Sequence, residues 1–300
     1  MCASASRSGT WTPRLADPRR GDGRGTSESG FVAVPGGSIY FESQGAGHPL
    51  VLLHAGVANL RMWDFQVDRF AERHRVIRYD TRGYGRTESE HVEFSNRADL
   101  AAIMDHCLAA SAFVLGASRG GGIALDFALE YPRRVDALIV AAGGISGYRP
   151  PAATERQSIW DEAERMWKAH DWERLSDFET RWWVDGPEQP PDRVDAALRE
   201  RVHDWILSTY RAEKEEGIPI QLEPPAVGRL AELEVPTLVL LGELDDPATN
   251  DSCRRLAGEI TGARLETFPT AHMINLEEPD RFAATVMSFL ASAEGTTRSA

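Results

Sequence analysis

Short apolar segments alternate with amphipathic segments along most of this 300-residue chain, and this alternation constrains the possible folds more than any other feature. The strand-like segments are residues 31–34, 38–43, 49–56, 75–80, 112–118, 135–143, 235–242 and 263–268. Strands that alternate with helices form βαβ units, whose strands lie parallel in one sheet. The segment 49–56 is a continuous apolar run, as a strand covered on both faces requires. We therefore predict an α/β fold with a mostly parallel, twisted sheet flanked by helices.

The alternation is interrupted once, by residues 144–226, which contain no convincing strand pattern. Helical patterns in this segment, separated by proline and glycine breaks, cover residues 153–170, 172–184 and 191–213. A segment of this kind between two halves of an alternating pattern indicates an insertion. We predict one core domain, made of residues 30–143 and 227–300, with an inserted helical cap at 144–226.

Composition limits the classes to which the protein can belong. The net charge is −13 and the sequence pI is near 5.1, which argues against non-specific binding to nucleic acid or anionic membranes. No apolar run approaches the roughly 18 residues that would suggest a membrane span. Cys2, Cys107 and Cys253 lie far apart and do not form a disulfide framework, so we expect a cytoplasmic protein.

Residues 1–29 are polar and aperiodic, and we expect a disordered extension or translation from an upstream start codon.

A strand pattern turns into a helix pattern at Gly116-Ala117-Ser118-Arg119-Gly120, which fits the motif G-x-S-x-G. In this motif the serine is a nucleophile on a tight turn, and bulky residues two positions before or after it would clash. The following helix directs backbone N–H groups toward developing negative charge. Small residues also make ordinary turns, so the assignment of Ser118 as a nucleophile depends on a base and an acid elsewhere in the chain.

Candidates for these two partners occur later in the chain, in the expected order of acid and then base. Asp245 and Asp246 follow the strand-like segment 235–242, and we take Asp245 as the acid and Asp246 as the alternative. His272 follows the next strand-like segment and is the candidate base. All three positions lie at the carboxyl ends of strands, where parallel strands bring their following residues to one edge of the sheet.

The oxyanion that forms during acyl transfer needs two backbone donors. We assign one to the N–H of Arg119, directly after the nucleophile, and the other to Gly56, two residues past His54. We interpret His54 itself as a residue that holds this loop through hydrogen bonds. The guanidinium of Arg119 is a candidate for binding a substrate carboxylate, or it pairs with an acidic neighbour.

Five segments together resemble the α/β-hydrolase fold superfamily. They are HAGVANLRMW (54–63), YDTRGYGRTE (79–88), GASRGG (116–121), GELDDP (242–247) and AHMINLEEPDRF (271–282). The chain is most similar to a subgroup of capped serine hydrolases that includes 3-oxoadipate enol-lactonase-like hydrolases, esterases and C–C bond hydrolases. The resemblance covers residues 31–292 and implies the α/β-hydrolase fold with an inserted helical cap, whereas it says much less about the substrate.

Several residues match or depart from the pattern of that superfamily. The D-x-R-G-x-G turn corresponds to Asp80, Arg82, Gly83 and Gly85, which we interpret as structural. The usual His-Gly pair is His54-Ala55 here, although Gly56 follows. Arg119 stands where such proteins often have an uncharged side chain, and its backbone N–H remains able to serve the oxyanion.

Tryptophan is concentrated in the predicted cap. Six of the eight tryptophans lie there: Trp160, Trp167, Trp172, Trp182, Trp183 and Trp205. Most are expected to pack the thin helical layer, because several share a helix face. Trp182 and Trp183 are candidate substrate contacts, although two adjacent residues on one helix cannot both face inward. A cap of this kind favours small to medium, partly apolar substrates.

These features predict a serine hydrolase that cleaves a carboxylic ester or lactone of a small molecule through an acyl-enzyme. The alternatives are a C–C bond hydrolase with the same residues, a ligand-binding receptor on the same fold, and cofactor-free oxygenase or haloperoxidase chemistry. No metal-ligand pattern or nucleotide fingerprint is present, so we expect no metal and no cofactor. The expected partner is a small-molecule substrate, with no nucleic acid and no membrane, and the sequence does not indicate the oligomeric state.

Overall fold

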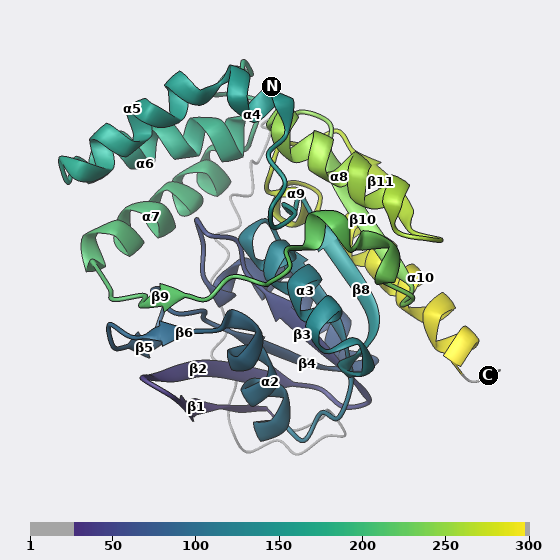
Figure 1. The fold of residues 1–300 in the computed structure, drawn as a ribbon. Coiled ribbons are helices and arrows are strands. Elements are labelled where there is room, and N and C mark those ends of the chain that lie inside the picture. Colours follow the sequence, from purple (N-terminus) through teal and green to yellow (C-terminus); the bar gives the residue numbers. More distant parts are fainter. Residues whose placement is uncertain (1–26, 298–300) are drawn as a thin grey trace, which may run out of the picture.

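The computed structural model describes residues 27–297, and one twisted sheet organises this part of the chain (Figure 1). Its nine strands within the described residues are β1 (Glu28–Val34), β2 (Gly37–Gln44), β3 (His48–Leu53), β4 (His74–Tyr79), β5 (Glu88–Ser89), β7 (Ala112–Ala117), β8 (Val135–Ala141), β10 (Thr237–Gly242) and β11 (Arg264–Phe268). The order across the sheet is β1-β2-β4-β3-β7-β8-β10-β11, and β5 pairs with β2. The pairings of β1, β2 and β5 are antiparallel, whereas β4, β3, β7, β8, β10 and β11 are parallel. The predicted fold class is therefore confirmed.

Two short segments differ from the sequence prediction. Glu28 and Ser29 were included in the expected disordered extension, yet they begin β1, where the backbone pairs with Ser43 and Glu42 of β2. Pairing through the backbone tolerates polar side chains in an edge strand, so composition gave no signal. The remainder of that extension, residues 1–26, lies outside the described residues. The predicted cap also contains one short strand, β9 (Ile218–Pro219), which pairs with β6 (Glu93–Phe94) of the predicted core. Two residues are too few to produce a periodic pattern.

The buried sheet has an apolar layer on each face, as the continuous apolar strands predict. In β3, Val51 and Leu53 face one layer and Leu50 and Leu52 face the other, and none of the four has solvent exposure. The first layer packs against α2 (Asn96–His106), α3 (Arg119–Glu130) and α8 (Pro247–Glu259), and the second against α1 (Asp64–Ala71) and α10 (Pro279–Thr297). Burial of both faces makes the parallel strands a rigid support for the loops at their ends.

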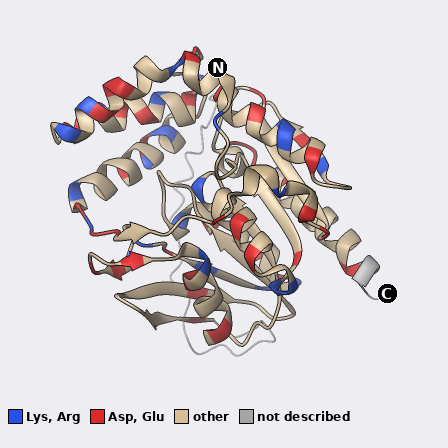
Figure 2. Ribbon diagram, in the orientation of Figure 1, with Lys and Arg blue, Asp and Glu red and all other residues tan. Residues whose placement is uncertain are grey.

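Helices between β8 and β10 form a separate group, which we call the insert helices: α4 (Pro151–Glu155), α5 (Gln157–Lys168), α6 (Trp172–Thr180), the π-helical turn η3 (Arg181–Asp185) and α7 (Ala196–Ala212). Figure 1 shows α5, α6 and α7 together at one end of the molecule, apart from the helices that flank the sheet. Acidic and basic residues are interspersed along α5 and α6 (Figure 2), with exposed ion pairs such as Lys168–Glu164 at 2.7 Å. Such pairs contribute little to stability, so the insert helices are held mainly by small apolar clusters. No helix in the described part of the chain combines the length and apolarity needed to cross a bilayer.

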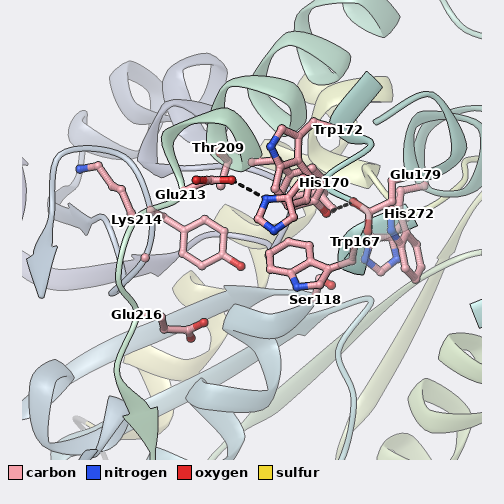
Figure 3. Close-up of a pocket in the computed structure, with 16 residues that line it drawn as sticks. Ser118, Trp167, His170, Trp172, Glu179, Thr209, Glu213, Lys214, Glu216 and His272 are labelled. Carbon is pink, nitrogen blue, oxygen red and sulfur yellow. Dashed lines mark hydrogen bonds and ion pairs between the residues drawn. The ribbon is translucent and has the colours of Figure 1, made fainter. Parts of the chain in front are cut away.

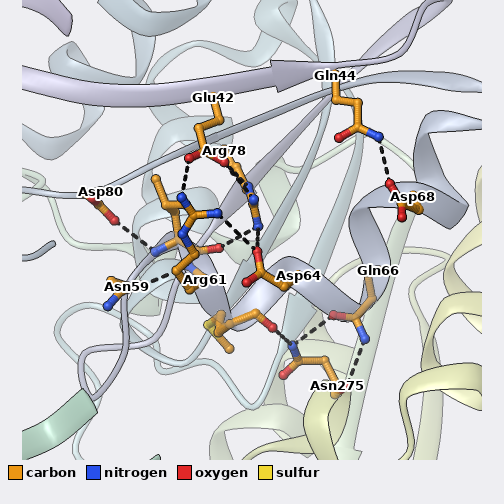
Figure 4. A network of polar contacts seen from close by, with 12 residues as sticks. Glu42, Gln44, Asn59, Arg61, Asp64, Gln66, Asp68, Arg78, Asp80 and Asn275 are labelled. Carbon is orange, nitrogen blue, oxygen red and sulfur yellow. Dashed lines mark hydrogen bonds and ion pairs between the residues drawn. The ribbon is translucent and has the colours of Figure 1, made fainter. Parts of the chain in front are cut away.

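The segment that follows β3 is held by a network of polar contacts (Figure 4). The Asp80 carboxylate accepts from the N–H of Leu60 at 2.9 Å, and the Arg78 guanidinium donates to the carbonyl of Leu60 at 3.1 Å. The Asn275 amide donates to the carbonyl of Met62 at 2.9 Å. These contacts tie the 3₁₀ turn η1 (Leu60–Trp63) both to the end of β4 and to the short helix α9 (Ile274–Glu277), which is distant in the sequence.

Candidate active site

The sequence-predicted site residues lie at one edge of the sheet. Gly56 follows β3, Ser118 follows β7, Asp245 follows β10 and His272 follows β11. These four strands are parallel, so their carboxyl ends meet at this edge. The order of the strands thus brings together residues that are separated by more than 200 positions in the chain.

Ser118 occupies a strained turn between β7 and α3. Its φ is 53° and its ψ is −118°, a conformation that side-chain-bearing residues rarely adopt. A Cβ atom on Gly116 would lie 2.1 Å from the carbonyl oxygen of Gly120, and one on Gly120 would lie 2.5 Å from the carbonyl oxygen of Leu53. Both positions therefore require glycine, because the backbone approaches so closely that a side chain would clash, as the G-x-S-x-G motif predicts. Strain that the surrounding packing maintains in this way is typical of functional sites.

His272 and Asp245 form a buried hydrogen-bonded pair. His272 Nδ1 lies 2.7 Å from Asp245 Oδ2, and the side chains of the two residues are 3 % and 0 % exposed. Because an ionised carboxylate only accepts, this contact places the proton on Nδ1 and leaves Nε2 as a base. A Cβ atom on Gly242 would lie 2.1 Å from the carbonyl oxygen of Ala271, so this glycine permits the two loops to approach each other.

Asp246 has a different role from its neighbour. It is the N-cap of α8, and its carboxylate accepts from the N–H of Ala248 at 3.1 Å. Its own N–H donates to Asp245 Oδ1 at 2.6 Å. Burial, as the largest effect, raises the pKa of Asp246. Asp245, rather than Asp246, is therefore the carboxylate that orients the imidazole.

His54 holds the loop that contains Gly56. Its Nδ1–H donates to the carbonyl of Ala55 at 2.8 Å, and its Nε2 accepts from the N–H of Thr81 at 3.0 Å. Burial lowers the pKa of His54 to about 3, and the charge of Arg119 acts in the same direction. An imidazole that is neutral near pH 7 and has both nitrogens hydrogen-bonded fits the loop-holding role interpreted from the sequence.

Ser118 and His272 line the same cavity, whose volume is about 590 Å³ (Figure 3). The other lining residues are Gly56, Val57, Gly83, Tyr84, Trp167, His170, Trp172, Glu179, Trp183, Thr209, Tyr210, Glu213, Lys214 and Glu216. The carboxyl edge of the sheet provides one wall of the cavity, which we call the sheet wall. The insert helices and the segment after α7 provide the other, which we call the insert wall. A cavity of this size accommodates a small to medium organic molecule.

The two candidate tryptophans separate, and the structure corrects the expectation for one of them. Trp183 lines the cavity, and its ring centroid lies 4.4 Å from that of His272. Trp182 does not line it; its ring packs on Phe178 and Trp160 among the insert helices. Consecutive residues on a helical turn point in clearly different directions, which explains why only one can face the site.

The Arg119 side chain is already engaged by protein groups. Its guanidinium donates to Thr81 Oγ1 at 2.6 Å and pairs with Glu216 at 2.5 Å. It also lies 5.0 Å from the ring centroid of Tyr84. Of the two roles considered from the sequence, pairing with an acidic neighbour is the one present here. Its backbone N–H, at the first position of α3, has no partner within the helix. A Cβ atom built on Gly56 would lie 3.4 Å from Cδ of Arg119, so the two residues are neighbours in this part of the structure.

Sequence reasoning missed several residues of the insert wall. Glu179 accepts a hydrogen bond from the hydroxyl of Tyr210 at 2.5 Å, and burial raises the pKa of this carboxyl to about 7. Single glutamates and tyrosines give no signal in a sequence, because only the packing of α6 against α7 brings these two together. In the described residues, no group of three His, Cys, Asp or Glu side chains is arranged to hold a metal ion.

A parallel sheet with a strained serine, a histidine–aspartate pair and a covering layer of helices defines the architecture of an α/β hydrolase. Residues 48–279 match the family model described as the alpha/beta hydrolase fold, and the chain belongs to this family.

Relatives with several different activities share the fold. The chain is 26 % identical, over 84 % of its length and 93 % of the relative, to a putative 2-succinyl-6-hydroxy-2,4-cyclohexadiene-1-carboxylate synthase of Bacillus subtilis (strain 168). It is 29 % identical, over 84 % of its length and 91 % of the relative, to the 2-hydroxy-6-oxononadienedioate/2-hydroxy-6-oxononatrienedioate hydrolase of Escherichia coli (strain K12). The structure of the enol-lactonase from Burkholderia xenovorans LB400 matches with a TM-score of 0.70 and 25 % identity, covering 87 % of this chain and all of that one.

Proposed function

We propose that this protein is a serine hydrolase that cleaves a carboxylic ester or lactone of a small to medium, partly apolar molecule. One observation carries the proposal: His272 is hydrogen-bonded to the buried Asp245 and lines one cavity together with Ser118. A serine hydroxyl is a weak nucleophile, and this arrangement supplies the base and the orienting carboxylate that activate it.

In the proposed mechanism, the hydroxyl oxygen of Ser118 attacks the acyl carbon while Nε2 of His272 accepts the hydroxyl proton. Asp245 stabilises the imidazolium that results. The N–H groups of Arg119 and Gly56 donate to the carbonyl oxygen as it becomes negatively charged. The imidazolium then gives its proton to the departing alkoxide, and the acyl group stays on Ser118. Water, deprotonated by His272, releases the acid and regenerates the serine.

C–C bond hydrolysis is the second candidate for the same residues. The relative in Escherichia coli is named as a hydrolase of 2-hydroxy-6-oxo dienedioate and trienedioate compounds, whereas the similar structure from Burkholderia xenovorans is an enol-lactonase. The two reactions need the same base and oxyanion donors, and they differ in the leaving group that must be protonated. The similarity to an enol-lactonase and the partly aromatic cavity favour the ester or lactone.

A panel of short-chain p-nitrophenyl esters, lactones and vinylogous 1,5-diketones, incubated with the purified full chain, decides between these candidates. We expect turnover of esters or lactones to exceed turnover of every diketone. Faster cleavage of the diketones would replace the ester assignment with C–C hydrolysis. Absence of turnover together with tight ligand binding would instead indicate a receptor on this fold.

A further inference from the structure

The insert helices present several aromatic rings to the cavity that Ser118 lines. Trp167, Trp172 and Tyr210 all line the cavity, and their ring centroids lie 5.2 to 5.8 Å from one another. Trp183 lines it beside His272, and Figure 3 shows Trp167 and Trp172 among the residues that surround Ser118. Aromatic rings can pack against apolar groups of a ligand, and the negative face of a ring also attracts a cation.

Three carboxylates line the same cavity, and they differ in how their charge is balanced. Glu213 lies 2.7 Å from the ring of His170, and Glu216 pairs with Arg119. Glu179 has the hydroxyl of Tyr210 as its partner and, within residues 27–297, forms no salt bridge. Glu179 is therefore a carboxyl with a hydrogen-bond donor but no cation to neutralise it.

The cations near the cavity are not arranged to receive an anionic substrate. Arg119 is held by Glu216, Thr81 and the ring of Tyr84. Lys214 donates to the carbonyl of Thr87 at 3.1 Å, and Figure 3 shows its ammonium group directed away from Ser118. A substrate carboxylate would consequently face Glu179 without a free cation to bind it.

We propose that the cavity selects esters bearing a cationic ammonium group, which is held by the carboxylate of Glu179 and the rings of Trp167, Trp172 and Tyr210. This inference rests on the proposed ester hydrolase and specifies its substrate class. An ammonium group would supply the opposite charge that Glu179 lacks, and its methyl or methylene groups would contact the aromatic rings. A carboxyl that burial holds partly protonated near neutral pH becomes fully ionised when such a cation binds.

Three butyrate esters of similar size test the selectivity: choline butyrate, its uncharged isostere 3,3-dimethylbutyl butyrate, and the anionic 4-(butyryloxy)butanoate. For the wild-type chain we expect kcat/KM to be at least about tenfold higher for the choline ester than for the neutral ester, and lowest for the anionic ester. The substitution Glu179→Gln keeps an acceptor for Tyr210 but removes the charge, and it should lower the ratio of choline to neutral ester about tenfold.

The matched control is Glu164→Gln, which removes a carboxylate that pairs with Lys168 on an exposed face of α5, outside the cavity. Its choline-to-neutral ratio should equal that of the wild type. The proposed selectivity is overturned if the kcat/KM ratio of choline to neutral ester is one or less in the wild type. It is also overturned if this ratio is the same in Glu179→Gln and the wild type. In both cases the proposed ester hydrolysis still stands.

Calorimetry with tetraethylammonium probes the cation site without any reaction. Binding to the wild type, and about tenfold weaker binding to Glu179→Gln, is expected. If no ester is hydrolysed but this difference in binding is found, the proposed hydrolysis fails and the cation site stands. If the neutral ester is hydrolysed but tetraethylammonium binds both proteins equally or neither, the cation site is refuted.

Discussion

The two walls of the cavity differ in how their polar side chains are partnered. On the side of the sheet, His272 is hydrogen-bonded to Asp245, His54 is hydrogen-bonded to Ala55 and Thr81, and all three side chains are buried. On the insert wall, Glu213 and His170 are largely exposed, and Glu179 has only a tyrosine for a partner. The sheet wall is therefore preorganised without a ligand, whereas the insert wall has polar groups left for one. We interpret the first as the wall that performs the chemistry and the second as the wall that selects the substrate.

The largest effect is expected from Ser118→Ala, which removes the nucleophile from the sheet wall. Because no other side chain takes over its bond to the acyl group, kcat should fall at least about a thousandfold for every substrate. Circular dichroism and thermal unfolding serve as the control for folding. Near wild-type turnover by this variant would show that the chemistry does not reside on the sheet wall.

Asp245→Asn and Asp246→Asn, compared side by side, test which aspartate of the sheet wall orients the imidazole of His272. The first replaces the acceptor of His272 Nδ1–H and favours the wrong tautomer, so kcat should fall at least about a hundredfold. The second preserves a good helix N-cap and should change kcat only a few-fold. Steady-state kinetics on one ester measure both, and the reverse order of effects would make Asp246 the acid.

Trp183→Leu tests whether a residue of the insert wall also supports the candidate catalytic base, His272. The indole contacts the imidazole of His272, and its loss would free the ring to move, so kcat/KM should fall about tenfold. Trp182→Leu is the matched neighbour, since its ring packs among the insert helices away from the cavity. A larger loss of kcat/KM in Trp182→Leu than in Trp183→Leu would break the division between the two walls.

The substitution His54→Gln is expected to change the pH dependence of stability rather than turnover. The pKa of His54 is lowered in the folded protein from 6.5 to about 3, so the unfolded chain binds more protons between these values. Stability from this residue is thus fully present above pH 6.5 and is lost as the pH falls, by about 2 kcal/mol at pH 5. Urea unfolding at pH 7.5 and pH 5 should show a smaller loss in His54→Gln than in the wild type. Equal losses would show that the sheet wall does not depend on a neutral His54.

The sequence revealed the sheet wall more completely than the insert wall for physical reasons. Continuous apolar strands and the glycines around Ser118 are local signals, because burial on two faces and a tight turn each restrict residue type. The choice between Asp245 and Asp246 needed the structure, since only the capping of α8 shows which carboxylate is free to face His272. The contact between Glu179 and Tyr210 gave no signal, because it depends on how α6 packs against α7.

Chemical labelling measures the central claim most directly, namely that His272 and Asp245 make the hydroxyl of Ser118 reactive. The full chain is treated with a fluorophosphonate, and the adduct is located by mass spectrometry of its peptides. We expect one rapidly formed adduct on Ser118 in the wild type and labelling at least about a hundredfold slower in His272→Ala. An adduct on another residue, or equally fast labelling of Ser118 without the imidazole, would contradict it.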